Sequence, residues 1–226
     1  MISIENITKI YSPDIVALND INLKIQSGEF ISLVGPSGAG KSTLIKLLIA
    51  QERPTDGRVL IGDKDVSHLS SRQVPYYRRK IGVVWQDFKL LKNKTIGENV
   101  AYALEVCERP NSEIRSKVPQ ILKLVGLEGK EDRFPRELSG GEVQRASIAR
   151  ALVHDPHMLI ADEPTGNLDP VNTDEIIKLL LKINKLGTTV LLATHNKDVV
   201  DALKRRVIVL EKGKVTSDKK IGRYSL

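Results

Sequence analysis

A glycine-rich segment constrains the fold of this chain more than any other part of the sequence. It has the spacing G-x-x-x-x-G-K-[ST] and consists of Gly35, Pro36, Ser37, Gly38, Ala39, Gly40, Lys41, Ser42 and Thr43. The apolar run 30–34 before it is typical of a buried strand, and residues 41–50 after it carry leucines at helical spacing. The segment is therefore expected to join a strand to a helix, the context in which this spacing indicates a phosphate-binding loop.

The chemistry expected of this loop follows from its residue types. Glycines let the backbone curl so that successive N–H groups point at phosphate oxygens, and the following helix adds the positive end of its dipole. Lys41 provides a cation for the β- and γ-phosphates, and Ser42 provides a hydroxyl for Mg²⁺. A glycine-rich turn that only opens a helix is the alternative interpretation. We expect the chain to bind a nucleoside triphosphate.

The composition is that of an ordinary folded domain. The 226 residues, 41% hydrophobic and 28% charged, suffice for one large domain or one domain with a small subdomain. No apolar run approaches the roughly 18 residues of a membrane span. A net charge of +7 could favour an anionic membrane surface, nucleic acid or simply a nucleotide. Much of the excess is scattered, and its few small clusters have no interleaved aromatic residues, so we expect a basic surface near a membrane. The single cysteine, Cys107, excludes an internal disulfide and is consistent with a reducing cytosol.

The order of patterns along the chain predicts an α/β fold. The first 25 residues alternate apolar and polar side chains, which indicates antiparallel strands beside the nucleotide-binding core. After residue 157, apolar strands near 158–161, 189–193 and 207–210 alternate with a helix near 173–186, which favours a mainly parallel sheet between helices.

Residues 95–137 form a helical block inserted into this core. Thr95 and Glu98 have the spacing of a capping box, and residues 114–125 repeat apolar side chains at helical spacing. Pro119 should either kink that helix or mark its true start, and Gly126 should end it. We predict a single nucleotide-binding domain over 1–226, with 1–94 and 138–226 forming the β-subdomain and P-loop core and 95–137 forming a helical subdomain.

A second motif, L-S-G-G-E at residues 138–142, is also expected to face an anion. Ser139 and Glu142 match a capping box, so a purely structural helix start explains part of the motif. It does not explain Gly140 and Gly141, which would leave backbone N–H groups uncovered at a helix N-terminus.

A third motif is the apolar run 158–161, which ends in two acids. A carboxylate at the exit of a buried strand is costly unless it meets a cation. Asp162 therefore suits Mg²⁺, through water, and Glu163 is placed to polarise an attacking water.

Together these motifs resemble those of the ATP-binding cassette (ABC) ATPases, and the resemblance covers essentially the whole chain. It implies that Tyr11 stacks on adenine, that Gln86 links Mg²⁺ or water to the partner contact, and that His195 lies near the γ-phosphate. Strand packing remains open for Tyr11, as does a satisfied strand-end histidine for His195. The implied catalytic residues are Glu163, His195, Gln86 and Ser139. The implied nucleotide contacts are Tyr11, the nine loop residues, Gly140, Gly141 and Asp169 of the family's D-loop, and the implied metal contacts are Ser42, Gln86 and Asp162.

The same resemblance implies a dimer. In this family ATP is sandwiched between two subunits, with the phosphate loop of one facing the L-S-G-G-E of the other. This chain carries one copy of each motif. A complete site therefore requires a second copy, giving a homodimer on ATP binding, or a related chain.

Residues 85–106 are most similar to the bacterial cell-division members of the family, although Trp85 replaces the usual phenylalanine. This implies an integral membrane partner of the FtsX type and a peripheral location at the cytoplasmic face of the cell membrane. The stretch 164–170 is shared with lipoprotein-releasing and macrolide-exporting members, which remain the alternative. Three apolar residues near a predicted loop, Phe88, Leu90 and Leu91, are expected to hold a short helix of the partner or to pack beneath the helical block.

Members of three other functional classes differ from this pattern. A DNA-repair or chromosome-organising ATPase would have a long coiled coil between the two glycine motifs, and a translation-factor member would normally carry two cassettes. A non-hydrolysing scaffold would be expected to have lost Glu163 or His195.

Overall fold

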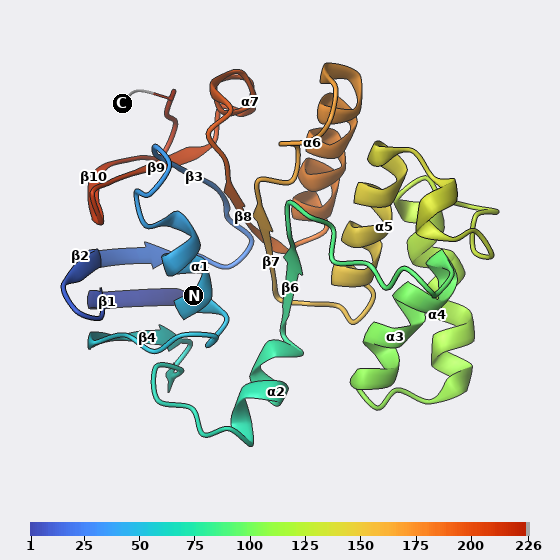
Figure 1. Cartoon of the computed structure of the whole chain (residues 1–226), viewed down its shortest axis with the longest axis horizontal. Helices are drawn as coiled ribbons and strands as arrows, with labels where there is room; N and C mark the ends of the chain where they lie inside the picture. Colours follow the sequence, from blue (N-terminus) through green and yellow to red (C-terminus); the bar gives the residue numbers. More distant parts are fainter. Residues whose placement is uncertain (225–226) are drawn as a thin grey trace. The chain divides into compact units, whose positions relative to one another are not determined.

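The computed structural model describes residues 1–224 (Figure 1). The chain forms two compact units: unit 1 comprises Met1–Arg78 and the chain from Gly187 onward, and unit 2 comprises Arg79–Leu186. The predicted helical subdomain 95–137 lies wholly within unit 2, and its boundaries stay a prediction. Within residues 1–224, no helix is both long enough and apolar enough to cross a membrane.

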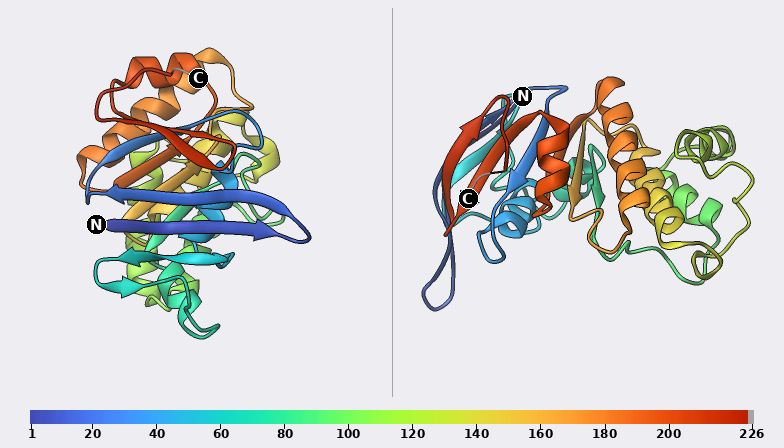
Figure 2. Two further views of the ribbon diagram at one scale, coloured as in Figure 1. Left: turned by 90° about the vertical axis from the view of Figure 1, so that its left-hand side faces the viewer. Right: turned by 90° about the horizontal axis from the view of Figure 1, so that it is seen from above.

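Unit 1 contains an antiparallel sheet at its N-terminal end, as predicted. Its strands follow the order β2-β1-β4-β5, and they are β1 (Ile2–Tyr11), β2 (Ile15–Ile25), β4 (Asp56–Ile61) and β5 (Lys64–Asp65). Ile2 pairs with Ile25 and Ile4 with Leu23, which places the alternating apolar side chains on one buried face. Figure 2 shows β1 and β2 as one long hairpin.

Unit 1 also contains the strand that leads into the glycine loop. β3 (Phe30–Val34) is buried throughout and pairs in parallel with both β8 (Thr189–Ala193) and β9 (Arg206–Glu211). β10 (Lys214–Lys219) adds antiparallel to β9. The helices of this unit are α1 (Lys41–Leu48), α2 (Gln73–Arg78) and α7 (Lys197–Leu203). The parallel pairing of β3 with β8 and β9, together with the separate antiparallel sheet, confirms the predicted α/β class.

Unit 2 combines two parallel strands with four helices. β6 (Ile81–Val84) pairs in register with β7 (Met158–Asp162). The helices are α3 (Ile96–Val106), α4 (Asn111–Leu124), α5 (Gly140–Leu152) and α6 (Pro170–Lys185), with a 3₁₀ turn at Pro135–Glu137. In Figure 1, α3, α4 and α5 lie together, and all three pack on one another.

Local signals at the helix ends are mostly confirmed. Thr95 and Glu98 form the predicted capping box, and Gly126, in a left-handed conformation with φ 73°, follows the end of α4. α4 begins at Asn111, so Pro119 does not mark its start and the helix continues through it. α6 begins earlier than predicted because Asp169 caps it and Pro170 occupies its first position.

The turn after β6 holds two consecutive non-glycine residues in the left-handed region. Phe88 has φ 58° and Lys89 has φ 53°, a conformation that costs about 1–2 kcal/mol per residue. Side chains of α5 compensate: Ser147 Oγ donates to the Phe88 carbonyl at 3.1 Å, and Arg150 donates to the Phe88 and Lys89 carbonyls at 3.0 and 2.5 Å. Burial lowers the pKa of Arg150. We call Ser147, Arg150 and these two carbonyls the α5 clamp.

Replacing Arg150 by Met should test the clamp. The substitution removes the donor of two carbonyl groups in a strained turn, so the free energy of unfolding should fall by about 2–3 kcal/mol. Arg150→Lys should lower the free energy of unfolding by a smaller amount, because an ammonium group cannot donate to both carbonyls in the geometry of a guanidinium group. Urea denaturation would measure both changes. Arg133→Met, which removes a guanidinium side chain that is 64% exposed, is the control and should leave the midpoint unchanged. An Arg150→Met protein as stable as its parent would contradict the clamp.

Candidate functional site

The glycine loop connects β3 to α1, which confirms its predicted strand-to-helix context. Gly38 and Gly40 are left-handed, with φ 77° and 105°. A Cβ at Gly40 would lie 2.6 Å from the Ala17 carbonyl oxygen, and one at Gly35 would lie 2.1 Å from that of Leu210. A Cβ at Gly38 would meet open space. Glycine is therefore required at Gly35 by close packing, at Gly38 by backbone conformation, and at Gly40 by both.

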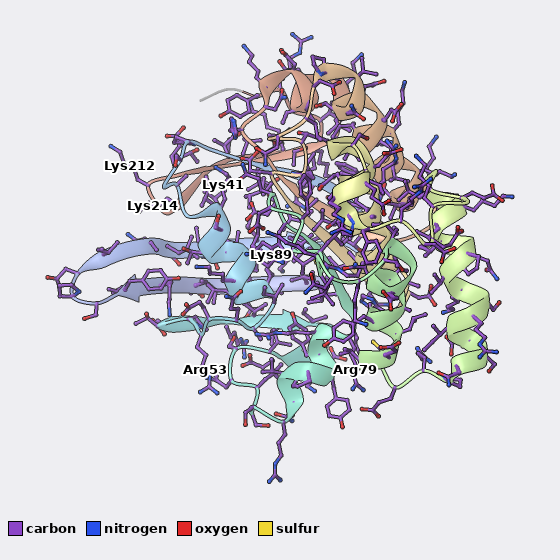
Figure 3. The ribbon with its side chains drawn as sticks, turned by 45° about the vertical axis from the view of Figure 1, so that its right-hand side comes forward. Lys41, Arg53, Arg79, Lys89, Lys212 and Lys214 are labelled. Carbon is purple, nitrogen blue, oxygen red and sulfur yellow. The ribbon has the colours of Figure 1, made fainter. Side chains whose placement is uncertain are left out.

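The turn between β9 and β10 supports the loop from outside. The Gly213 N–H donates to the Ala39 carbonyl at 3.1 Å, and the Gly213 carbonyl accepts from the Asn19 N–H at 2.8 Å. Figure 3 labels the two lysines that flank Gly213, Lys212 and Lys214, together with Lys41. This turn thus links the loop to β2 through backbone hydrogen bonds.

Lys41 lies in the first turn of α1, and its ammonium group turns back toward the loop. Nζ donates to the Gly35 carbonyl at 2.6 Å and to the Pro36 carbonyl at 3.1 Å. No acidic residue occupies the first turn of α1, so the positive end of the helix is not neutralised there. Pro36, Ser37, Gly38 and Ser42 are exposed, whereas Ala39 is buried and Thr43 is half-buried. A phosphate group fits this loop, and Ser42 is accessible to a metal ion bound to it.

His195 lies at the same end of the sheet in unit 1 as the loop. Leu33 of β3 pairs with Ala193 of β8, and the Thr194 N–H donates to the Leu33 carbonyl at 3.1 Å. Gly35 and His195 each follow these paired residues by two positions, and His195 is exposed. Unit 1 therefore brings the loop and the histidine predicted to lie near the γ-phosphate to one carboxyl edge of parallel strands.

Tyr11 ends β1, where the hairpin turns back into β2. One face of its ring is occupied by Lys9, whose Nζ lies 4.9 Å from the ring centroid. The Tyr11 hydroxyl is buried and has no hydrogen-bond partner among residues 1–224. A planar ligand would therefore stack on the ring face opposite Lys9.

Unit 2 brings together the next three predicted residues. Because Val84 of β6 pairs with Ala161 of β7, Gln86, Asp162 and Glu163 lie at the carboxyl ends of these two strands. Glu163 itself is left-handed, with φ 48°, a strained conformation for a residue with this side chain. The following loop packs on Gln86: a Cβ at Gly166 would lie 3.1 Å from Gln86 Nε2.

Asp169, assigned to the nucleotide by resemblance, acts as the N-cap of α6. Its Oδ1 accepts from the N–H groups of Val171 and Asn172 at 2.9 and 3.0 Å, and its Oδ2 accepts from the Asn172 side chain. Hydrogen bonds from the Asn172 backbone and side chain lower the pKa of Asp169. The Asn172 amide in turn occupies the space beside Gly141, where a Cβ would lie 1.9 Å from Asn172 Oδ1. Gly141 thus has a packing role in addition to the exposed N–H groups expected from the sequence.

Ser139 is the N-cap of α5 and forms a complete capping box with Glu142. The Ser139 N–H and hydroxyl both donate to Glu142 Oε2, at 2.8 and 3.1 Å, and Lys130 forms an ion pair with Glu142 Oε1. The Lys130 ammonium, together with the Ser139 backbone, lowers the pKa of Glu142 to about 2. The structural explanation of this part of the motif is therefore confirmed, and Ser139 is nevertheless exposed.

Sequence reasoning missed several residues that shape these loops. Asn99, fully buried in α3, accepts from the Leu91 N–H at 2.7 Å and donates to the carbonyls of Leu91, Lys94 and Thr95. A polar residue within the apolar stripe of a helix was the signal that could have identified it. Lys130 and Arg150 gave no such signal, because their partners are distant in sequence.

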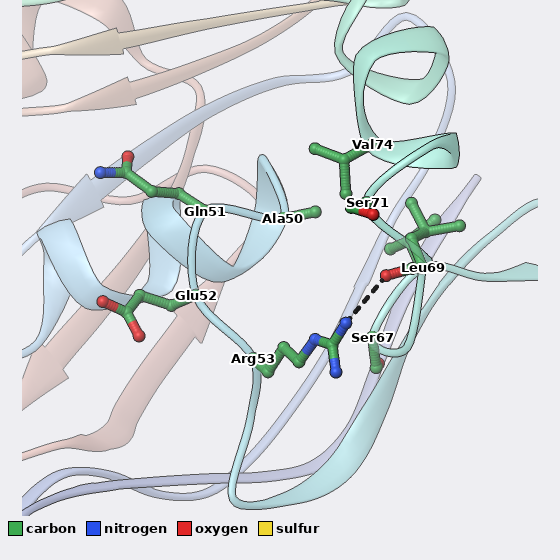
Figure 4. A pocket seen from close by; sticks show the side chains of 9 residues that line it. Ala50, Gln51, Glu52, Arg53, Ser67, Leu69, Ser71 and Val74 are labelled. Carbon is green, nitrogen blue, oxygen red and sulfur yellow. Dashed lines mark hydrogen bonds between the residues drawn. The ribbon is translucent and has the colours of Figure 1, made fainter.

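Two surface pockets contain none of the predicted site residues. One lies in unit 1 around Arg53, whose guanidinium donates to the Leu69 carbonyl at 3.1 Å (Figure 4). The other lies in unit 2 between the end of α4, Arg145 and α6. Residues 1–224 contain no group of three or more His, Cys, Asp or Glu side chains able to hold a metal ion.

Comparison with known proteins identifies the family. The ABC transporter family matches residues 18–166. The chain is 50% identical over 224 residues to the cell division ATP-binding protein FtsE of Bacillus subtilis (strain 168), covering 99% of this chain and 98% of that protein. It is 50% identical over 227 residues to FtsE of Mycobacterium tuberculosis (strain ATCC 25618 / H37Rv), covering 100% and 99%.

A solved structure agrees with these matches. The ATP-binding cassette MJ0796, determined as a dimer in a post-hydrolysis state bound to ADP and Pi, is 36% identical with a TM-score of 0.88. The match covers 99% of this chain and 100% of that one. The resemblance indicated by the glycine loop, L-S-G-G-E and the strand ending in two acids is confirmed: the chain belongs to the ABC transporter family, as one of its ATP-binding cassette ATPases.

Proposed function

We propose that this chain is the ATP-hydrolysing subunit of a membrane complex that acts in bacterial cell division. The observation that carries the proposal is the 50% identity, over essentially full length, to two proteins named for that role. The residues needed for hydrolysis are all present, including Glu163 and His195. An ATPase subunit of a lipoprotein-releasing or macrolide exporter is the alternative that the partner experiment below would detect.

The family motifs assign a role in nucleotide binding to each candidate residue. The loop N–H groups and Lys41 bind the phosphates, with the Lys41 ammonium transferred from the Gly35 and Pro36 carbonyls to phosphate oxygens. Tyr11 stacks on adenine through the ring face that Lys9 leaves open. By the family's motifs, Ser42, Gln86 and Asp162 would be the residues that hold Mg²⁺, which would neutralise phosphate charge.

Hydrolysis requires a base and donors around the γ-phosphate. Glu163 accepts the proton of the attacking water, and its strained backbone supports an assignment to the reaction rather than to packing. His195 donates to the γ-phosphate from the end of β8. Ser139, Gly140 and Gly141 contact the γ-phosphate bound by a second copy. Asp169 lies near these residues, because the Asn172 side chain donates to the Asp169 carboxylate and packs against Gly141. ATP binding therefore drives head-to-tail dimerisation.

Lys41→Ala tests nucleotide binding. The substitution removes the cation but leaves the loop backbone, so the protein should fold and bind ATP about 10- to 100-fold more weakly. Isothermal titration with ATP and Mg²⁺ measures the affinity, and thermal denaturation without nucleotide verifies the fold. Affinity equal to that of the parent in a folded variant would contradict the site.

Glu163→Gln tests the base. The amide keeps the size and hydrogen bonding of the carboxylate but cannot accept the proton, so ATP turnover should slow by about 10²–10⁴-fold. ATP binding should persist, and dimers should accumulate in gel filtration with ATP because the step that separates them is blocked. Turnover at the parental rate would require another base.

The partner is proposed to be an FtsX-like integral membrane protein, which places the chain at the cytoplasmic face of the membrane. Of the three apolar residues singled out from the sequence, Leu91 is 39% exposed, and Phe88 and Leu90 are half-buried. The α5 clamp fixes the turn before Leu91, and Asn99 fixes the loop after it. Tyr102 and Val106 are exposed on α3, three and seven residues beyond Asn99, so they extend the same helix face. This apolar surface is the proposed docking site for a short cytoplasmic helix of the partner.

Leu91→Glu tests the docking site. A buried charge in the interface should weaken membrane recruitment by about tenfold or more while ATP binding is unchanged. Leu186→Glu, at an exposed position after α6 that is 69% exposed, is the matched control and should be recruited normally. Co-purification of the tagged protein from native membranes measures recruitment. Recovery of a lipoprotein-releasing or drug-exporting permease, in place of an FtsX-like protein, would refute the role in cell division.

A further inference from the structure

The hydroxyl of Ser139 is engaged by a carboxylate of its own chain. Both the N–H and the hydroxyl of Ser139 donate to Glu142 Oε2, so the only hydroxyl proton available to a γ-phosphate points at Glu142. Glu142 remains ionised throughout the physiological range, because its pKa is about 2. In the proposed dimer, a phosphate bound at Ser139 therefore approaches a negative charge of this chain.

Lys130 is the residue that offsets this charge. Its ammonium pairs with Glu142 Oε1, the oxygen that Ser139 does not use. The Lys130 side chain is 40% exposed and that of Glu142 is 19% exposed, so the pair lies at the surface that presents Ser139. Without the lysine, the Glu142 carboxylate would lack the ion pair that offsets its charge beside Ser139.

We propose that Lys130 is a positioning residue for the nucleotide of a second copy: by neutralising Glu142, it allows Ser139 to receive the γ-phosphate across the dimer interface. The inference rests on the proposed ATP-driven dimer. It adds that a lysine outside the glycine motifs, twelve residues before Glu142, determines how tightly the L-S-G-G-E end of α5 accepts an anion. A lysine that only stabilised the capping box would affect folding and not the response to ATP.

A double-mutant cycle separates these two roles. In the Glu163→Gln background, where dimers accumulate, Lys130→Met should raise the ATP concentration for half-maximal dimerisation about tenfold, as measured by analytical ultracentrifugation. Glu142→Gln keeps the capping geometry and leaves the Lys130 ammonium unopposed, so it should dimerise at the parental ATP concentration or a lower one. The combined Lys130→Met and Glu142→Gln variant should return to within about twofold of the parent, because the charge that Lys130 neutralises is gone.

Further measurements make the test specific. Lys130→Arg should restore dimerisation, and the effect of Lys130→Met should shrink as salt is raised. Binding of a fluorescent ATP analogue to the monomer should be the same in all variants. Lys123→Met is the matched control, since Lys123 pairs with Glu128 at a site where both side chains are about two-thirds exposed or more, and it should change nothing.

Two results would overturn the inference. If Lys130→Met dimerises at the parental ATP concentration, the lysine has no role at the interface. If Lys130→Met is impaired and Glu142→Gln does not rescue it, the lysine does not act by neutralising Glu142. Absence of ATP-dependent dimers already in the Glu163→Gln parent would instead refute the proposed dimer, and the role of Lys130 with it.

Discussion

Parallel pairing of strands is the constraint on which the rest of the structure depends. Because the carboxyl ends of parallel neighbours meet at one edge, residues far apart in sequence are brought together wherever two such strands end. In unit 1 this places the glycine loop after β3 beside His195 after β8. In unit 2 it places Gln86 after β6 beside Asp162 and Glu163 after β7. Each unit thus brings one set of candidate site residues to the ends of buried strands.

The sequence predicted those parts of the structure that depend on local chemistry. The glycine loop, the capping boxes at Thr95 and Ser139, and the buried strands all follow from short-range patterns. For Pro119 the sequence left a kink or a helix start open, and the structure contradicts the start, because α4 begins at Asn111. The family motifs then allowed candidate site residues to be named without any knowledge of the fold.

Contacts between distant segments could not be predicted. The α5 clamp joins residues about sixty positions apart, and nothing near Arg150 indicates that its guanidinium serves the carbonyls of Phe88 and Lys89. Left-handed conformations at a phenylalanine and a lysine also oppose local propensity, so no single-sequence pattern would suggest them. The compensation comes from contacts with α5, which the local sequence does not specify.

The packing of Asn172 against Gly141 has a consequence for how such proteins can vary. The amide of Asn172 fills the volume that any side chain at position 141 would need, and the same amide holds the carboxylate of Asp169. A homologue could carry alanine at position 141 only with a smaller residue at position 172, and it would then need another way to cap α6. The residues at the start of α5 and at the start of α6 are therefore expected to vary together among homologues. Comparison of natural sequences would test this contact independently of the structure.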